Sequence, residues 1–287
     1  MRIAVIGSTG QLGTDLVDQL TRSGDHQLLL LPHERLDVTQ RDQVHAAVAG
    51  MDVVINCAAF VRVDDCEEHP ALAVAVNTLG ALHVAQACAA HGALCTYIST
   101  DYVFRGDKGT PYTEDDQPTP VNVYGATKAS GELMVQQAAP KWLILRIASV
   151  FGAAGARGKG GNFVEAILQQ AKSGRPIRVV ADQWMSPTYT RDVASSMETL
   201  LRNGATGLFH AANTGRCSWY AFATTALQMV GLAVAVEPIS AADLIRPAKR
   251  PQDASLACER LAKITGPIPP WEDALHRYLV EKGHRSA

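Results

Sequence analysis

The stretch "RIAVIGSTGQLGTDLVDQL" at residues 2–20 contains a short apolar run, a glycine-rich turn and the start of an amphipathic segment. The apolar run predicts a buried strand, and the spacing of apolar residues after the turn predicts a helix. Gly7, Gly10 and Gly13 lie between the two. In a dinucleotide site the first glycine allows the tight turn, the second lets a pyrophosphate approach the backbone, and the third lets the helix pack closely on the strand. The stretch therefore predicts a dinucleotide site at the start of the chain.

The remainder of the first half repeats this alternation of strand and helix. Strand-like runs lie at residues 26–31, 52–59, 93–100 and 142–152. Helical patterns lie between them, at residues 41–50, 70–92 and 126–139. Strands that alternate with helices predict βαβ units and a parallel sheet. We therefore predict the α/β fold class, with a Rossmann-type doubly wound parallel sheet and a smaller C-terminal α/β substrate domain.

The pattern changes after Gly152, where the glycine-rich segment "GAAGARGKGGN" precedes short helices, isolated strands and many prolines. We predict an NAD(P)-binding Rossmann domain at residues 1–150 and a substrate-binding domain at residues 151–287. The second domain is expected to pack at the carboxyl edge of the sheet, where open α/β sheets bind ligands. A helical pattern near residues 186–202 is predicted to return to the Rossmann domain.

Composition argues against several classes of partner. The chain has 287 residues, a net charge of −2 and no long basic run, so neither nucleic acid nor an anionic membrane is an expected partner. The first apolar run is too short for a membrane span and is not followed by a small-residue cleavage site. Six cysteines without a CxxC pair are typical of reduced thiols in a cytoplasmic protein, and no metal site is expected.

The end of the second predicted strand bears on the choice of cofactor. An acid there would bond the ribose 2′-hydroxyl of NAD, but this chain has Pro32, followed closely by His33 and Arg35. These side chains favour the 2′-phosphate of NADPH, with NADH as the second candidate. The alternative is that Arg35 is a solvated loop charge. The other cofactor-binding candidates beside the predicted strand ends are Gln11, Leu12, Asp37, Val38, Ala58, Ala59 and Phe60.

Two further segments carry the candidate chemistry. "STDYVF" at residues 99–104 ends a predicted strand, and "VYGATK" at residues 123–128 sets Tyr124 and Lys128 one helical turn apart. A phenol near an ammonium group, beside a hydride donor, suits the reduction of a ketone. The glycine turn and this YxxxK pair together resemble the short-chain dehydrogenase/reductase superfamily. The C-terminal domain resembles that of its extended branch.

The resemblance narrows to one family when longer segments are compared. "NFVEAIL" at residues 162–168, "SPTYTRDVA" at 186–194 and "RPAKRPQDASL" at 246–256 extend the match over nearly the whole chain. Together with the segments above, they resemble the dTDP-4-dehydrorhamnose reductase family. YxxxK alone is a weak signal, but this combination is specific.

The resemblance implies a role for each matching residue. Tyr124 would be the general acid that gives a proton to the carbonyl oxygen as hydride arrives. Lys128 would lower the pKa of that phenol and bond the nicotinamide ribose. Thr100 would hydrogen-bond the substrate carbonyl, and Asp101 and Tyr102 would contact the sugar. Related dehydratases carry an acid at the position of Tyr102, so simple reduction is favoured over dehydration.

The implied function is NAD(P)H-dependent reduction of the 4-keto group of a nucleotide-linked 6-deoxy sugar, with dTDP-4-dehydro-L-rhamnose, which gives dTDP-L-rhamnose, as the first substrate candidate. Two alternatives stay open. One is a non-catalytic subunit similar to the regulatory subunit of methionine adenosyltransferase, and the other is a nucleotide-sugar epimerase with tightly held NAD. The intact tyrosine–lysine pair favours catalysis. The oligomeric state is open, with a homodimer as one candidate.

The substrate side shows one departure from the family and one cationic segment. Where the family usually has a tryptophan that packs on the sugar, in a motif like Arg-Thr-Ser-Trp-Val-Tyr, this chain has Ser149. Loss of an indole predicts a wider or different sugar pocket, and the alternative is that Arg157 folds over the gap. Arg250, with Arg246 and Lys249 nearby, is predicted to bind a nucleotide diphosphate. The alternative for these three is a solvated charge cluster.

Overall fold

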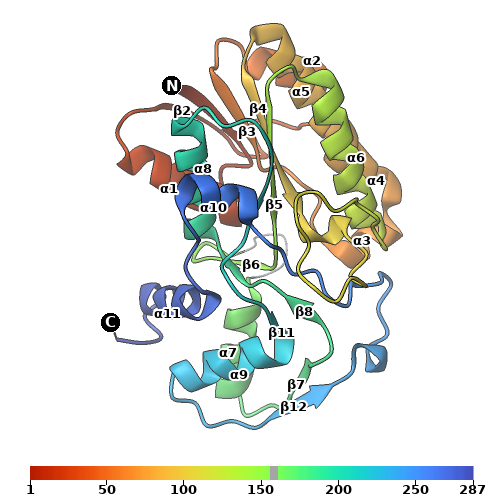
Figure 1. Ribbon diagram of the computed structural model, residues 1–287, viewed down its shortest axis with the longest axis vertical. Helices are drawn as coiled ribbons and strands as arrows, with labels where there is room; N and C mark the ends of the chain where they lie inside the picture. Colours follow the sequence, from red (N-terminus) through yellow and green to blue (C-terminus); the bar gives the residue numbers. More distant parts are fainter. Residues whose placement is uncertain (156–160, 287) are drawn as a thin grey trace.

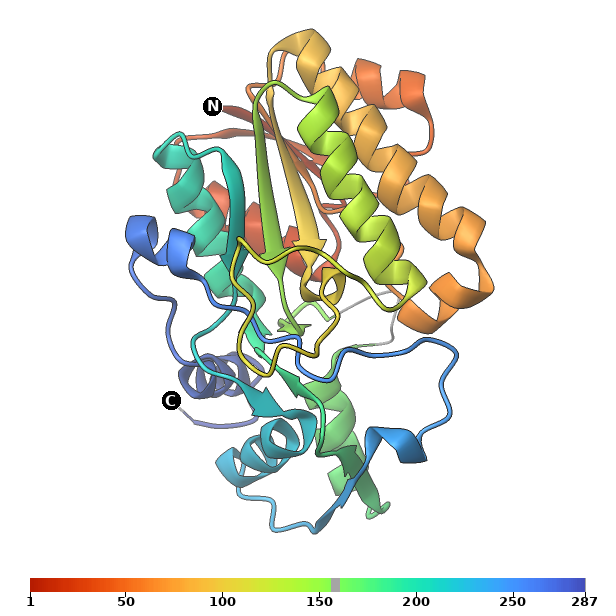
Figure 2. The ribbon, with the colours of Figure 1, turned by 45° about the vertical axis from the view of Figure 1, so that its right-hand side comes forward.

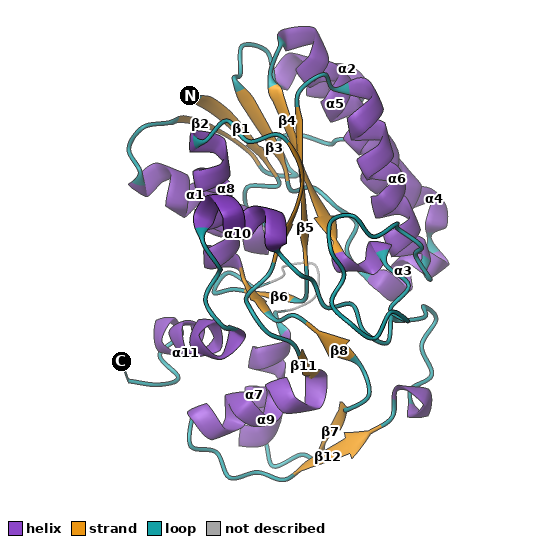
Figure 3. Ribbon diagram, in the orientation of Figure 1, coloured by secondary structure: helices purple, strands orange, loops and turns teal. Residues whose placement is uncertain are grey.

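The computed structural model describes residues 1–155 and 161–286. Within these residues, the central feature is a six-stranded sheet of parallel strands with helices on both faces (Figures 1 and 3). In order across the sheet, the strands are β10 (Gly207–Ala211), β5 (Trp142–Ile147), β4 (Leu94–Thr100), β3 (Val53–Asn56), β1 (Arg2–Ile6) and β2 (Gln27–Leu31). The predicted α/β class with a Rossmann-type parallel sheet is confirmed.

The side chains of β1 alternate between two core layers, because successive residues of a strand point to opposite faces. The helices that cover the sheet are α1 (Gln11–Arg22) and α8 (Thr190–Arg202) on one face, and α2 (Arg41–Ala47), α5 (Gly80–His91) and α6 (Val123–Ala138) on the other. Ile3 and Val5 are buried in the layer of α1 and α8. Ala4 and Ile6 are buried in the layer of α2, α5 and α6.

Two segments depart from the regular elements that the sequence predicts. The single helix expected at residues 70–92 contains a π-helical turn, because α4 (Pro70–Val74) is followed by η1 (Ala75–Leu79) before α5 begins. The strand expected at residues 142–152 is interrupted after β5. Ser149 has a φ of 40°, a left-handed conformation that ends the extended ladder, and a separate strand β6 (Val150–Phe151) follows.

The helical run Pro70–His91 combines a membrane-like composition with a partly buried position. Its 22 residues and mean hydropathy of 1.4 would allow it to cross a bilayer by length and composition. However, Ala81, Ala85 and Cys88 are fully buried against the sheet. Small apolar side chains of this kind are typical of a core helix, so the run gives no argument for a membrane span.

The chain after β6 forms a smaller layer beside the carboxyl edge of the sheet (Figure 1). Its elements are α7 (Phe163–Lys172), β7 (Ile177–Val180), β8 (Trp184–Met185), β9 (Thr188–Tyr189), β11 (Cys217–Ser218), α9 (Trp219–Met229), β12 (Val236–Ile239) and α11 (Trp271–Glu281). Its core contains the stacked rings of Phe151 and Tyr189. Within this stretch the chain also returns to the sheet, since α8 packs on α1 and β10 pairs with β5. The remaining short elements are α3 (Val63–Glu68), η2 (Asp101–Val103), η4 (Ala241–Asp243) and α10 (Glu259–Thr265).

A buried ion pair fixes α6 to the sheet. Figure 2 shows α6 in front of the sheet and alongside α5. Arg146 of β5 donates from Nε to Oε1 of Glu132 at 2.8 Å and from Nη2 to Oε2 at 2.6 Å, and both side chains are 3% exposed. Ser99 of β4 donates a third hydrogen bond to Oε1 of Glu132 at 2.5 Å. Removing one partner of such a pair leaves a buried charge without compensation.

We expect Glu132→Gln to lower the free energy of unfolding by about 3–5 kcal/mol, because Arg146 keeps its charge in the core and loses its counter-ion. Urea denaturation measures the loss. The matched control is Glu237→Gln, which breaks the exposed pair between Arg178 and Glu237 and should have a far smaller effect. Equal losses in the two variants would show that the buried pair does not fix α6.

Candidate active site

One large cavity lies at the carboxyl edge of the parallel strands. Its volume is about 1050 Å³, at the upper end of the usual range for ligand cavities. The predicted site residues that line it are Gly7, Gly10, Gln11, Leu12, Gly13, Asp37, Val38, Ala58, Ala59, Phe60, Thr100, Asp101, Tyr102, Tyr124, Lys128 and Ser149. Arg35 and Arg250 are not among the described lining residues. The structure therefore brings most of the predicted site together.

The glycine turn between β1 and α1 lets other groups come close to its backbone. Gly7 has a φ of 74°, a conformation that favours glycine. A Cβ atom on Gly13 would lie 2.2 Å from the carbonyl oxygen of Gly7, so α1 can pack on the turn only with glycine there. Oε1 of Gln11, the first residue of α1, has no hydrogen-bond partner among the described residues. A helix N-terminus behind an open glycine turn fits a pyrophosphate held by backbone N–H groups.

The segment after β2 forms another part of the cavity wall. His33, Glu34 and Asp37 line it, whereas Arg35 is exposed to solvent, as the alternative of a solvated loop charge requires. Asp37 accepts from Thr39 N at 2.9 Å and Thr39 Oγ1 at 2.8 Å, and these bonds hold the pKa of its carboxyl below the usual value. Sequence reasoning missed Glu34, because the acid was sought at the strand end rather than in the turn that follows it.

The loop after β3 is fixed by one buried amide. Phe60, with Ala58 and Ala59, lines the cavity. Oδ1 of Asn77 accepts from Phe60 N at 2.8 Å, and Nδ2 donates to Phe60 O at 3.1 Å. Nδ2 also donates to Oγ1 of Thr127 in α6 at 3.1 Å. The side chain of Asn77 therefore joins the loop after β3 to the helix that carries the candidate acid.

The residues at the end of β4 form a hydrogen-bonded turn. Oγ1 of Thr100 donates to Oδ1 of Asp101 at 2.9 Å and accepts from the backbone N of Tyr102 at 3.2 Å, which caps η2. The ring of Tyr102 meets the ring of Tyr124 edge to face, with centroids 5.9 Å apart. The hydroxyl, the carboxylate and both phenols thus lie on one side of the cavity.

Helix α6 begins three residues before the predicted helical pattern. Oδ1 of Asn122 caps it by accepting from Gly125 N at 2.8 Å. A Cβ atom on Gly125 would lie 2.1 Å from the carbonyl oxygen of Tyr102, which accounts for the glycine in "VYGATK". This close approach puts Tyr124 in the first turn of α6, and Lys128 follows one turn later.

Burial shifts the pKa of both candidate catalytic residues. Burial raises the pKa of the Tyr124 phenol well above its usual value, and a hydrogen bond with Thr100 opposes the shift. Burial lowers the pKa of Lys128 to about 7, against the opposing charge of Glu132. Lys128 is not among the groups that shift the pKa of this phenol, so the lowering that the sequence predicts stays a prediction. The phenol carries its proton at neutral pH, as a general acid must.

The N–H donors of the Lys128 ammonium group are not used by the described residues. Its side chain is 1% exposed, and Nζ has no hydrogen-bond partner among the described residues. An ammonium group has three N–H donors and no acceptor. Because Lys128 lines the cavity, Nζ fits a ligand that presents hydroxyl oxygens, as a nucleotide ribose does.

Arg250 forms an ion pair that the sequence does not predict. Its guanidinium donates to Asp64 of α3 from Nη1 at 2.9 Å and from Nη2 at 2.7 Å. A bidentate pair of this kind occupies the fork that would otherwise meet a phosphate. The Arg250 charge also opposes the burial that raises the pKa of Tyr102, so it acts on the site through that phenol rather than as a wall of the cavity. Arg246 and Lys249 are exposed.

An aromatic pair from the smaller layer completes the cavity. Phe163 at the start of α7 and Trp219 at the start of α9 line it, with ring centroids 4.7 Å apart. Ser149 lines the same cavity, and the predicted alternative neighbour, Arg157, lies outside the described residues. The segment "SWY" at residues 218–220 is typical of a helix start, so the sequence alone indicates packing rather than a cavity position for Trp219. Ser218 does cap α9, accepting from Ala221 N at 3.1 Å.

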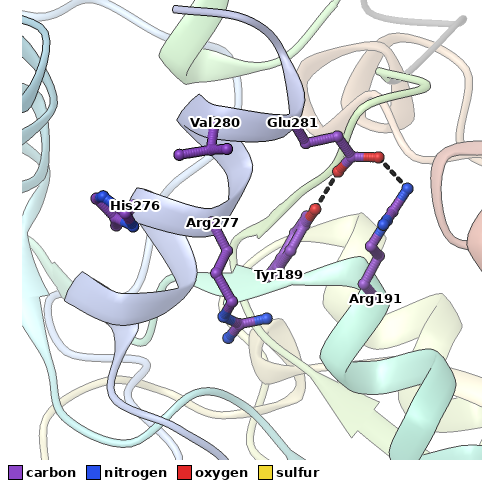
Figure 4. Close-up of a pocket in the computed structure, with 6 residues that line it drawn as sticks. All are labelled: Tyr189, Arg191, His276, Arg277, Val280 and Glu281. Carbon is purple, nitrogen blue, oxygen red and sulfur yellow. Dashed lines mark hydrogen bonds and ion pairs between the residues drawn. The ribbon is translucent and has the colours of Figure 1, made fainter. Parts of the chain in front are cut away.

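A second, smaller cavity of about 350 Å³ lies between α11 and the start of α8. Figure 4 shows the carboxylate of Glu281 between the Tyr189 hydroxyl and the Arg191 guanidinium, both of which bind it. Arg277 donates to Asp192 of α8 at 2.8 and 2.7 Å. These charges are paired with one another, so this cluster docks α11 rather than forming a reactive site.

Comparisons with known proteins agree with this geometry. A family model described as RmlD substrate binding domain matches residues 1–283. The dTDP-4-dehydrorhamnose reductase of Mycolicibacterium smegmatis is 40% identical over 96% of this chain and 84% of its own length. A crystal structure of dTDP-4-dehydrorhamnose reductase from Bacillus anthracis in complex with NADP superposes with a TM-score of 0.92, at 34% identity, over 98% of this chain and 99% of that one.

One relative with a different sugar is also similar. A Streptomyces antibioticus protein named "Probable dTDP-4,6-dihydroxy-2-methyloxan-3-one 4-ketoreductase" is 36% identical over 96% of this chain and 93% of its own length. The relatives thus share 4-keto reduction in their names and differ in the sugar named.

Lys128 should make stability depend on pH. Because its folded-state pKa of about 7 lies below the ordinary lysine value of 10.5, the unfolded chain binds the extra proton between these values. The free energy of unfolding of the wild type should therefore rise with pH across this window. Lys128→Met removes the effect, so its gain in stability over the wild type should be roughly 2 kcal/mol larger at pH 7 than at pH 9.

Urea denaturation of both proteins at the two pH values measures this difference. Lys172→Met, at an exposed position of α7, is the matched control and should show no such dependence. A Lys128→Met gain that is the same at pH 7 and pH 9 would contradict the lowered pKa.

Proposed function

The chain belongs to the RmlD substrate binding domain family, and on that premise we propose that it reduces the 4-keto group of a nucleotide-linked 6-deoxy sugar with NADPH. One observation carries the proposal. The glycine turn, Thr100 and the Tyr124–Lys128 pair line the same cavity. A dinucleotide site and a proton donor are thereby adjacent, as hydride transfer to a ketone requires.

The proton comes from this chain. NADPH, when bound, supplies the hydride for the carbonyl carbon. Tyr124 donates its phenolic proton to the carbonyl oxygen, since the alkoxide that forms is a stronger base than a phenolate. Lys128 binds the ribose hydroxyls through the spare donors of Nζ, and its charge stabilises the phenolate that proton transfer leaves. Thr100 lines the same cavity, and its proposed role is to hydrogen-bond the substrate carbonyl.

NADPH is the proposed cofactor. The Bacillus anthracis relative was crystallised with NADP, and His33 lines the cavity where a 2′-phosphate would be met. Glu34 beside it offers an acceptor to the ribose 2′-hydroxyl of NADH. This part of the cavity wall is therefore compatible with NADH as a second cofactor.

The proposed substrate is dTDP-4-dehydro-L-rhamnose, reduced to dTDP-L-rhamnose in rhamnose biosynthesis. The names of the relatives support this choice. A second candidate is a dTDP-4-keto sugar of another shape. Ser149 in place of the family tryptophan favours it, as does the Streptomyces antibioticus relative, whose name gives a different sugar.

The remaining assignments follow from the same proposal. We propose that residues 1–150 form the NAD(P)-binding domain, to which the segment near 186–202 returns, and that residues 151–287 otherwise form the substrate-binding domain. We assign the protein to the cytoplasm, with a homodimer as the candidate oligomeric state. The alternatives of a non-catalytic subunit similar to the regulatory subunit of methionine adenosyltransferase and of an epimerase are less well supported, because Thr100, Tyr124 and Lys128 are all present at one cavity.

Tyr124→Phe tests the proton donor. The ring and the packing against Tyr102 stay, but the acid is lost, so kcat should fall by about 10²–10⁴. Steady-state kinetics with NADPH and dTDP-4-dehydro-L-rhamnose measures the fall. NADPH affinity, measured by quenching of protein fluorescence, should stay nearly unchanged. A variant with wild-type turnover would remove Tyr124 from the mechanism.

Ser149→Trp tests the sugar pocket. If the missing indole widens the pocket, the variant should reduce the rhamnose precursor with higher kcat/KM than the wild type, because an aromatic side chain buries about 150–250 Å². The matched comparison is Trp219→Ala, which should lower kcat/KM by removing the aromatic wall that is present. Should the wild type already be efficient with the rhamnose precursor and Ser149→Trp no better, the second substrate candidate is wrong.

A further inference from the structure

The aromatic ring of Tyr97 lies against the candidate catalytic lysine. Tyr97 belongs to β4 and is 1% exposed. Its ring centroid is 3.9 Å from Nζ of Lys128. A cation this close to the face of an aromatic ring is attracted by the ring's negative face, most strongly where water is excluded. Nζ has no hydrogen-bond partner among the described residues, and the contact with this ring is a direct interaction of its charge.

The hydroxyl of Tyr97 fixes the orientation of that ring. It donates to the carbonyl oxygen of Asn77 at 2.9 Å. Asn77 lies in the π-helical turn η1, where the regular ladder of α-helical hydrogen bonds is interrupted and a carbonyl needs another donor. The phenol satisfies that carbonyl, and the bond holds the ring below the lysine.

Gly131 makes this arrangement possible from the side of α6. A Cβ atom at Gly131 would lie 2.3 Å from the Tyr97 hydroxyl oxygen and 2.5 Å from the Asn77 carbonyl oxygen. Any larger residue would separate α6 from η1 and move Lys128 with it. The tyrosine therefore accounts for glycine at this position, one turn after the lysine that the ring contacts.

We propose that Tyr97 is a positioning residue for the reaction, and that its ring holds the Lys128 ammonium in its charged form at the cavity wall. The assignment of Lys128 to the reaction rests on the proposed function, but the contact itself does not. The ionisable groups that act on Lys128 are Glu132 on α6 and Cys57 after β3, and those that act on Tyr97 are Glu132, Tyr124 and Cys95. Glu132 is bound to Arg146, so it does not hold Nζ in place.

A double-mutant cycle separates this role from plain packing. Tyr97→Leu, Lys128→Met and the double variant are unfolded in urea at pH 6 and pH 9. Lys128 is charged in the fold at pH 6 and largely neutral at pH 9, because its pKa is about 7. We expect a favourable coupling between the two positions at pH 6 that disappears at pH 9. A coupling of equal size at both pH values, or none at pH 6, would overturn the proposal.

Tyr97→Phe is the matched control, since it keeps the ring and loses only the hydroxyl. A cycle of Tyr97→Phe, Lys128→Met and their double variant should show no coupling at either pH. A coupling as large as that measured with Tyr97→Leu would assign the effect to the hydroxyl and overturn the role of the ring. These measurements involve no turnover, so they are readable even if the proposed reaction is wrong.

The pH profile of kcat/KM for NADPH gives the second readout. Activity should fall as pH rises through the pKa of Lys128. In Tyr97→Leu, the fall in kcat/KM on the basic side of the profile should occur about one pH unit lower than in the wild type. A shift of this size corresponds to the expected cation–π contribution. Tyr97→Phe should keep the wild-type limb. A limb that does not move in Tyr97→Leu, or that moves to higher pH, would contradict the proposal.

Discussion

A buried ammonium group that forms no salt bridge with the described residues is the constraint around which this site is arranged. Transfer of a charge from water to a protein interior is costly, and the cost appears in the lowered pKa of Lys128. The simplest remedy would be a carboxylate beside it. Glu132 is one turn away on α6, but Arg146 binds it through two hydrogen bonds. The carboxylate is therefore engaged by the arginine, and the N–H donors of Lys128 Nζ have no hydrogen-bond partner among the described residues.

The range of an interaction along the chain decides how much of this could be predicted from sequence. The glycine turn, the alternation of strands and helices and the YxxxK pair are local patterns, and all three led to the correct fold and to the residues of the cavity. The bond between Arg250 and Asp64 joins residues 186 positions apart. No local pattern encodes it, so the arginine was expected to meet a phosphate. The interruption of the sheet strand at Ser149 likewise depends on tertiary contacts.

Apolar residues at the site were the hardest to predict. Phe163 and Trp219 occupy helix starts, and their sequence context is the same as that of aromatic residues in a core. Whether a ring faces a cavity or a neighbouring side chain depends on how α7 and α9 dock, which periodicity does not give. The residues with reactive side chains were easier, because a tyrosine, a lysine and a threonine at fixed places in a fold of this class rarely serve packing alone.

The reactive side chains and the aromatic pair of the cavity come from different layers of the fold. Thr100, Tyr124 and Lys128 come from the sheet layer, where the hydrogen bonds of Asn77 and the Glu132–Arg146 pair fix the backbone around them. The aromatic pair comes from the smaller layer, whose core is built from its own aromatic rings. Ser149 lies at the boundary of the two layers and lines the same cavity. Under the proposed function, a substitution there would therefore reshape the sugar pocket without moving the proton donor.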